Sequence, residues 1–357
     1  MELGIIGLPQ SGKTTLFNAL TRGDVPTGIS GGKVEVHTAV IDVPDERVDR
    51  LTEMFKSKKI VYAKVTYADV AGLEGKAAEG GISGPLLNTL GQMDGFIHVV
   101  RQFDSPLVPH RDGSIDPKRD LANMEAELII NDLILVERKL QRLEEERKRG
   151  GVGRDKAVVA RETELFEKLQ ALLTEEIPLR NETFTDDEEF MISSYGFLSK
   201  KPQLIVVNHA EDQTPIEIET PFARTTVVSM PAKLEMDIAQ LPAEEAEIFL
   251  VEYGIEEPGL NRFIKLSYDL LGLQSFFTAG DKETHAWTVA RGALAPEAAG
   301  VIHSDMQKGF IRAEVVSYDD LITLGSFAEA RNQGRLRVEG KKYVMQDGDV
   351  IEIRFNI

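Results

Sequence analysis

Short apolar runs alternate with amphipathic stretches over much of the chain, and this alternation predicts a parallel sheet covered by helices. The runs are strand-sized and rich in β-branched residues, and between them apolar residues recur every three or four positions. We therefore expect an α/β fold. The predicted strands are Leu3 to Ile6, Val34 to Val43, Ile60 to Ala68, Phe96 to Val100, Leu204 to Val207 and Thr225 to Val228.

A long helical pattern interrupts this alternation between the fourth and fifth predicted strands. Apolar residues spaced alternately by four and three, before and after the glycine-rich sequence 150–153, predict a helical hairpin of the antiparallel coiled-coil type. Arms of roughly 20 to 30 residues would project on the order of 30 to 45 Å from the sheet. Their charges fit either a solvated face or a partner surface. The spaced residues are Ile129, Leu133, Val136, Leu140, Leu143, Val158, Leu165, Leu169 and Leu172.

The last part of the chain changes character and becomes rich in short β runs separated by turns. One helical stretch, Pro296 to Ile302, lies among them, and Gln346-Asp347-Gly348-Asp349 is a strong turn signal. This pattern predicts a small sheet with a crossing helix. Its runs are Thr284 to Val289, Phe310 to Val316, Leu336 to Val338, Lys342 to Met345 and Val350 to Ile353.

Composition narrows the classes of protein that fit. A length of 357 residues favours two or three domains, and the absence of cysteine excludes disulfides and thiolate metal sites. No apolar run is long enough to span a membrane, so we expect a cytoplasmic protein. A net charge of −18 gives no overall attraction to nucleic acid, which leaves RNA contact to a local basic face. The best candidate face holds Arg331, Arg335, Arg337, Lys341 and Lys342.

Residues 7 to 14, Gly-Leu-Pro-Gln-Ser-Gly-Lys-Thr, form a phosphate-binding motif between a predicted strand and a predicted helix. The two glycines allow a tight loop whose backbone N–H groups point at the β-phosphate. Lys13 would reach the β- and γ-phosphates as a catalytic charge, and the Thr14 hydroxyl would coordinate Mg²⁺. The residues expected to bind phosphate are Gly7, Pro9, Gln10, Ser11, Gly12, Lys13, Thr14 and Thr15.

A second nucleotide motif, Asp69-Val70-Ala71-Gly72, follows the third predicted strand. An aspartate at this place holds Mg²⁺ through a water, and the N–H of Gly72 would meet the γ-phosphate. Ras-like enzymes position the attacking water with a glutamine next to this glycine, whereas this chain has Leu73. Because leucine cannot orient water, hydrolysis must use another group, depend on a partner or be very slow.

A third motif concerns the base. Asn208-His209-Ala210-Glu211 follows the fifth predicted strand, where guanine-specific proteins carry Asn-Lys-x-Asp. The longer side chain of Glu211 would displace the carboxylate from its bidentate contact with guanine, and His209 replaces the lysine that covers the base. Losing that contact removes the main discrimination against adenine, so ATP is the favoured nucleotide. Ser229 and Met230, after the next strand, are expected to contact the base.

These motifs, with the hairpin placed between the last two, resemble the YchF family of Obg-related P-loop NTPases. The resemblance covers essentially the whole chain and is most specific in the C-terminal third. It implies a Ras-like nucleotide domain over residues 1–118 and 196–274, an inserted coiled-coil domain over 119–195, and a C-terminal TGS domain of β-grasp shape over 275–357. The matching C-terminal segments are 254–262, 276–280, 298–303 and 309–315.

The resemblance also implies function. Members of the family prefer ATP to GTP, use Mg²⁺ and associate with ribosomes, and they carry a histidine linked to hydrolysis at the position of His110. A histidine titrates near neutral pH and can orient or deprotonate water. We therefore expect a slow ATPase switch, monomeric, with a GTP-dependent switch of the Obg type as the alternative. A small-molecule kinase is disfavoured because no acceptor site is recognisable.

Two departures from the family pattern affect the phosphate site. The family has a threonine in a Phe-Cys-Thr-Ile-like segment that contacts Mg²⁺, whereas this chain has Gly32 or Lys33 there, and neither Thr27 nor Thr38 can be assigned to the role. In the phosphate loop, Gln10-Ser11 replaces the usual Asn-Val.

Overall fold

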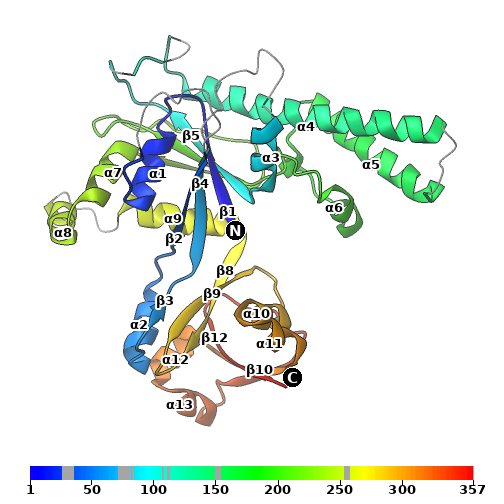
Figure 1. The fold of residues 1–357 in the computed structure, drawn as a ribbon. Helices are drawn as coiled ribbons and strands as arrows, with labels where there is room; N and C mark the ends of the chain where they lie inside the picture. Colours follow the sequence, from blue (N-terminus) through cyan, green and yellow to red (C-terminus); the bar gives the residue numbers. More distant parts are fainter. Residues whose placement is uncertain are drawn as a thin grey trace. The chain divides into compact units, whose positions relative to one another are not determined.

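The computed structural model describes residues 1–25, 36–70, 82, 84–106, 108–110, 113–148, 154–252 and 258–356. Its contacts divide the chain into two compact units (Figure 1). Unit 1 contains residues 1–39 and 66–260, and unit 2 contains residues 40–65 and 261–357. The nucleotide motifs and the helical hairpin all belong to unit 1.

Unit 1 is built on a sheet with the strand order β2-β4-β1-β5-β6-β7. The registered pairs β1–β4, β1–β5, β5–β6 and β6–β7 are parallel, as the alternating pattern predicts. β2 and β4 continue into unit 2. The strands are β1 (Glu2–Ile6), β2 (Val36–Asp42), β4 (Lys64–Val70), β5 (Gly95–Arg101), β6 (Gln203–Asn208) and β7 (Thr225–Met230).

Helices cover both faces of this sheet. One core cluster joins Leu90, Phe96 and Leu128, from α3, β5 and α4, so α3 and the start of α4 pack on the same face. α1 and α7 lie side by side, as Figure 1 shows. Besides α3 (Gly84–Gln92), the helices around the sheet are α1 (Lys13–Thr21), α7 (Ala232–Gln240) and α8 (Ala243–Glu252).

A helical hairpin extends from the sheet of unit 1 (Figure 1). Its two long helices pack along their length around Val136, Phe166 and Leu169, which are fully buried. The longer helix, with 32 residues, measures about 48 Å at 1.5 Å per residue. The hairpin and the segment after it consist of α4 (Pro117–Lys148), α5 (Lys156–Thr174), η2 (Leu179–Asn181) and α6 (Asp186–Ile192).

Buried acidic side chains fasten the first half of α4 to the segment that leads into β6. The carboxylate of Asp132 accepts hydrogen bonds from Leu198 N (2.8 Å), Ser199 N (2.7 Å) and Ser199 Oγ (2.6 Å). Burial raises the pKa of Asp132 to about 6, against the opposing effect of these hydrogen bonds. About two turns earlier, Glu125 forms a buried ion pair of 2.6 Å with Arg180. The base of the hairpin is therefore fixed by directional polar contacts as well as by packing.

Unit 2 has its own sheet, with the order β11-β10-β12-β8-β9-β3. β8 pairs antiparallel with β9 and parallel with β12, and α10 packs on one face around Phe276, Ala299 and Val315. A central parallel pair, flanked on each side by an antiparallel strand and crossed by a helix, is typical of a β-grasp fold. The strands are β3 (Ile60–Val61), β8 (Leu273–Ala279), β9 (Thr284–Ala290), β10 (Phe310–Ser317), β11 (Arg337–Glu339) and β12 (Asp349–Phe355).

The boundary of unit 2 differs from the predicted TGS boundary because residues 40–65 and 261–274 join it. Helix α2 (Glu46–Phe55) buries Val48 and Leu51, and it packs on β8 and β9. β3 separates from β4 and adds to the edge of β9, so the single predicted strand Ile60 to Ala68 is two strands in two sheets. The remaining helices of this part are α9 (Gly259–Leu270), α10 (Ala295–Ile302), α11 (Ser304–Lys308), α12 (Tyr318–Leu324) and α13 (Phe327–Asn332).

Candidate functional site: a phosphate loop at the ends of parallel strands

The segment between β1 and α1 forms a tight loop that needs its glycines. Gly7 has φ 146° and Gly12 has φ 98°, values that L side chains rarely adopt. A Cβ on Gly7 would overlap the carbonyl oxygen of Val99, and one on Gly12 would overlap the amide nitrogen of Asn208. The loop backbone therefore lies very close to the Val99 backbone and to the Asn208 side chain. A loop that wraps a phosphate requires such tight turns.

Lys13 lies inside the curve of this loop. Its ammonium donates hydrogen bonds to the carbonyl oxygens of Gly7 (2.9 Å) and Leu8 (3.0 Å). A cation held at this place, at the N-terminus of α1, adds to the positive end of the helix dipole and favours an anion in the loop. The predicted residues Pro9, Gln10 and Ser11 complete the loop. The Ser11 hydroxyl is buried and has no hydrogen-bond partner among the described residues.

The two predicted magnesium ligands, Thr14 and Asp69, are in contact. Thr14 Oγ1 donates to Asp69 Oδ2 at 2.8 Å, although 55 positions separate them in the sequence. Asp69 Oδ1 is buried with no partner in the described part of the chain. Burial raises the pKa of Asp69, while Thr14 and the nearby Lys13 and His37 act in the opposite direction.

A carboxylate oxygen with unused acceptor capacity beside a hydroxyl fits Mg²⁺, which prefers oxygen ligands and takes the rest from phosphate and water. No cluster of three or more histidine, aspartate or glutamate side chains that could hold a metal ion occurs in the described ranges. Gly72 and Leu73, named above for the γ-phosphate and the missing glutamine, and Thr27 fall outside the described residues.

Asn208, at the end of β6, holds the loop in place. Its Nδ2 donates to the carbonyl oxygen of Ser11 (3.0 Å), and its Oδ1 accepts from the backbone N–H of Ala232 at the start of α7 (3.1 Å). The side chain is 4% exposed. Both ends of the amide thus make a contact within the protein, so Asn208 positions the loop, and its contact with the nucleotide stays a prediction.

The other residues of the base motif lie at the same edge of the sheet. His209 Nδ1 is 2.7 Å from the carbonyl oxygen of Ala210, and Glu211 is exposed. Met230, the last residue of β7, lies opposite Asn208 in the sheet and is 5% exposed, whereas Ser229 is exposed. The motifs after β6 and β7 therefore come together beside the phosphate loop.

An aromatic residue that the sequence analysis did not single out lies next to this loop. The backbone N–H groups of Gln102 (2.8 Å) and Phe103 (3.1 Å) both donate to the carbonyl oxygen of Asn208. The Arg101 guanidinium stacks over the Phe103 ring at 4.4 Å. A Cβ on Gly12 would lie 3.9 Å from the edge of the ring. The sequence signal that could have indicated Phe103 is its position, because it follows β5 at the sheet edge where the other motifs end.

His110 is enclosed and paired with an acidic residue. Its Nε2 lies 2.9 Å from Asp120 Oδ2, and the two side chains are 8% and 4% exposed. Asp120 Oδ1 accepts two hydrogen bonds from the Arg119 guanidinium, at 3.0 and 2.8 Å. The sequence placed His110 in a polar loop, and the structure adds Asp120 as its partner from the first turn of α4.

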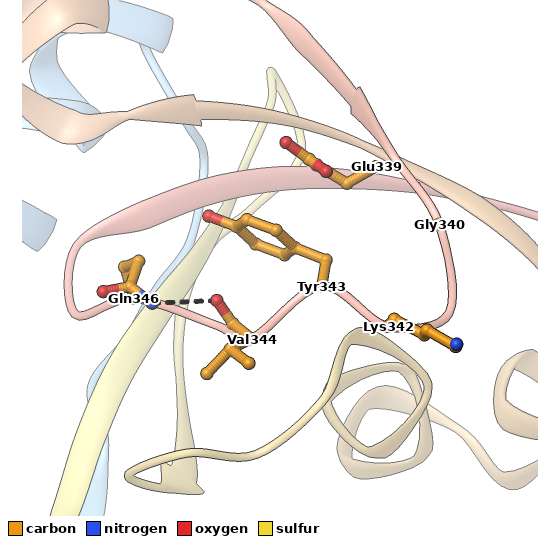
Figure 2. Close-up of a pocket in the computed structure, with 6 residues that line it drawn as sticks. All are labelled: Glu339, Gly340, Lys342, Tyr343, Val344 and Gln346. Carbon is orange, nitrogen blue, oxygen red and sulfur yellow. Dashed lines mark hydrogen bonds between the residues drawn. The ribbon is translucent and has the colours of Figure 1, made fainter.

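A surface pocket in unit 2 has a different character. It has a volume of about 490 Å³ and is lined by residues 339, 340, 342–344 and 346 (Figure 2). The Tyr343 hydroxyl donates to Asp349 (2.8 Å) and accepts from Arg337 (3.0 Å). Burial and Asp349 raise the pKa of Tyr343 to about 12, so this tyrosine stays neutral. The carboxylate of Asp349 is also paired with Arg337, and the pocket lining has no phosphate-loop motif, so the phosphate loop is the better candidate site.

The five cations of the predicted basic face do not act alike. Lys341 and Lys342 are exposed, and neither pairs with an acidic side chain among the described residues. The other three form ion pairs with acidic side chains of unit 2. These ion pairs join Arg331 to Glu314, Arg335 to Asp320 and Arg337 to Asp349.

Comparison with known proteins gives matches over the full length. A family model described as 50S ribosome-binding GTPase matches residues 2–139, and the C-terminal YchF-GTPase model, described as a protein of unknown function, matches residues 273–356. The proteins named ribosome-binding ATPase YchF from Bacillus subtilis and Haemophilus influenzae are 39% and 41% identical to this chain. Each alignment covers 100% of this chain and at least 99% of the relative.

A solved structure gives the same result. The YchF GTPase of Schizosaccharomyces pombe superposes with a TM-score of 0.85 at 32% identity, covering 99% of this chain and 97% of that one. The likeness therefore includes both units. Separately, within the described ranges no helix combines the length and the apolar character that crossing a membrane requires.

Proposed function

Because this chain belongs to the YchF family, we propose that it is an ATP-binding and slowly ATP-hydrolysing switch protein that acts on the ribosome in the cytoplasm. The observation that carries the proposal is the contact of Thr14 with Asp69 beside the loop that encloses Lys13. This contact brings together the hydroxyl, the carboxylate and the cation that an Mg²⁺-nucleotide site needs.

The parts have separate roles in this proposal. The backbone N–H groups of the loop and Lys13 bind the β- and γ-phosphates, and Thr14 holds Mg²⁺ with Asp69 acting through a water. When bound, Mg²⁺ neutralises charge that develops on the phosphates. Gly72 would add its N–H to the γ-phosphate, and His110 would orient or deprotonate the attacking water in place of the missing glutamine.

The base would lie against the edge formed by β6 and β7. Phe103 places the edge of its ring beside Gly12, and Met230 offers an apolar contact. Since Glu211 is one methylene too long for the bidentate guanine contact, little remains to reject adenine. This supports ATP over GTP.

Calorimetric titration of the full chain with ATP and with GTP in the presence of Mg²⁺ tests the nucleotide assignment. We expect ATP to bind at least as tightly as GTP, and steady-state phosphate release to be slow without a partner. Tighter binding of GTP by tenfold would favour the Obg-type switch, which is the alternative. The variant Lys13→Ala is the control, because it should bind neither nucleotide.

Ribosome contact is proposed through the free cations of unit 2. Lys341 and Lys342 are exposed and unpaired in the described ranges, so they can meet RNA phosphates on a protein that is otherwise acidic. Replacing both with glutamate should weaken co-sedimentation with ribosomes, more so at low salt. The matched control replaces the exposed Lys282 and Lys308, which changes the net charge equally. Equal loss in both double variants would mean that general charge, and not this surface, governs the association.

A further inference from the structure

We propose that Asp120 is the positioning residue for His110 in nucleotide hydrolysis. The proposal rests on the proposed role of His110 and adds a residue that no motif of the sequence points to. Its basis is the contact of 2.9 Å between His110 Nε2 and Asp120 Oδ2, in a place where both side chains are almost fully enclosed.

This contact decides which nitrogen of the imidazole carries the proton. A carboxylate is only an acceptor, so Nε2 carries the proton and donates to Asp120. A carboxylate that holds a histidine in one tautomer and orientation is the arrangement that hydrolytic sites use to make imidazole an effective base.

Asp120 is itself held in place by hydrogen bonds, so it can fix the orientation of the His110 ring. Its second oxygen, Oδ1, accepts two hydrogen bonds from the Arg119 guanidinium. Arg119 in turn donates to the hydroxyl and to the carbonyl oxygen of Ser114 (2.9 and 2.8 Å). Arg119 therefore holds one carboxylate oxygen, Oδ1, and His110 contacts the other, Oδ2.

The helix that carries Asp120 is also fixed. Glu125 and Asp132, further along α4, bind Arg180 and the backbone of Leu198 and Ser199. Leu198 and Ser199 lie just before β6, whose last residue holds the phosphate loop. Helix α4 therefore has a fixed position relative to the nucleotide site. Because Asp120 lies on α4 and bonds His110, it fixes the position of the His110 ring as well.

A double-mutant cycle in the full chain tests the proposal. His110→Ala, Asp120→Asn and the double variant are compared for kcat and KM of ATP hydrolysis in the presence of ribosomes. We expect Asp120→Asn to lower kcat by about 10- to 100-fold, as loss of a partner that orients a reactive group does, with KM and ATP affinity unchanged. The double variant should be no slower than His110→Ala, because Asp120 acts only through the histidine.

Two controls separate positioning from a structural role. Asp116→Asn removes an exposed carboxylate that bonds the backbone of Arg119 at the same helix end, and it should keep the parental kcat. Asp120→Glu keeps the charge and the fold but moves the carboxylate, so it should retain the parental melting temperature and lose kcat. If Asp120→Asn fails to fold, the Asp120→Glu variant takes its place in the cycle.

The outcomes separate failure of the positioning role of Asp120 from failure of the catalytic role of His110. If His110→Ala is slow but Asp120→Asn and Asp120→Glu match the parent, Asp120 does not position the histidine and the proposal fails alone. Additive losses in the double variant also overturn it, since they show an independent effect. If His110→Ala itself matches the parent, the proposed role of His110 falls together with that of Asp120.

Discussion

Asn208 and Ser11, which are 197 positions apart in the sequence, are joined by a buried hydrogen bond of 3.0 Å from the amide nitrogen to the carbonyl oxygen of the loop. The same amide accepts a hydrogen bond from Ala232 N. One side chain therefore connects the end of β6, the phosphate loop and the start of α7, so the base motif and the phosphate motif are parts of a single structure.

Asn208→Ala should weaken ATP and GTP binding to a similar extent. The substitution leaves the N–H of Ala232 and the carbonyl of Ser11 without partners, and a buried polar group without its partner costs about 1–3 kcal/mol. Loss of the hydrogen bond to Ser11 also loosens the phosphate loop. We therefore expect calorimetry to show roughly a tenfold loss of nucleotide affinity. Gln213→Ala, which removes a hydrogen bond to Ala210 N, is the control. A loss confined to one nucleotide would instead assign Asn208 to base reading.

Lys13→Ala and Thr14→Ala should each abolish tight binding of Mg²⁺-nucleotide while the protein stays folded. Lys13 supplies the charge inside the loop, and Thr14 supplies the hydroxyl beside Asp69. Thr14→Ser keeps that hydroxyl and should bind nearly as the parent does. Circular dichroism and nucleotide titration measure the two properties separately. Parental affinity in Lys13→Ala or Thr14→Ala would contradict the site assignment.

The double substitution Glu211→Asp and His209→Lys should shift the preference toward GTP. It restores the carboxylate at the distance that suits guanine and the aliphatic stem that covers the base. A good bidentate contact to a base is worth about 1–3 kcal/mol of discrimination, so the ratio of the two affinities should change about tenfold or more. Glu211→Gln with His209→Lys lacks the carboxylate and should not produce the shift. A parent that already prefers GTP by this factor would refute the adenine interpretation.

Much of the nucleotide site could be expected from sequence because its chemistry is local. The glycines and Lys13 occur within eight consecutive residues, and Asp69 follows an apolar strand. The family resemblance is confirmed by full-length relatives. Hydrophobic periodicity, however, shows that a helix has an apolar face without showing which sheet covers it. For this reason the sequence does not show that α2 packs on β8 and β9, and the pairing of Asp120 with His110 across a loop gave no local signal.

The buried pair of Glu125 and Arg180 predicts a large asymmetry between single and double substitutions. Arg180→Met leaves the Glu125 carboxylate buried and uncompensated, which should cost about 3–5 kcal/mol of stability. Adding Glu125→Leu removes that charge and should recover most of the loss. Urea unfolding of the two variants measures this difference. A double variant as unstable as Arg180→Met would show that the remaining contacts of Arg180, with Ser199 O and Thr225, matter more than the charge pair.

The pH dependence of stability should show the contribution of Asp132. Burial raises its pKa from 3.8 to about 6 in the folded protein, so the folded state binds a proton more tightly than the unfolded state between these values. The stability due to this proton is complete below about pH 4 and is lost as the pH rises through about 6.

Comparison of the parent with Asp132→Asn isolates this titration, because the amide does not ionise. The free energy of unfolding of the parent minus that of the variant should fall from pH 4 to pH 6 and stay constant above about pH 7. Urea unfolding followed by helical circular dichroism measures it. Ser199→Ala removes a hydrogen bond that lowers the pKa of Asp132. When the comparison with Asp132→Asn is repeated in the Ser199→Ala background, the difference in the free energy of unfolding should therefore keep falling to a higher pH. A difference that rises with pH would show that the hydrogen bonds to Leu198 and Ser199 outweigh desolvation, and that the carboxylate is the stabilising form.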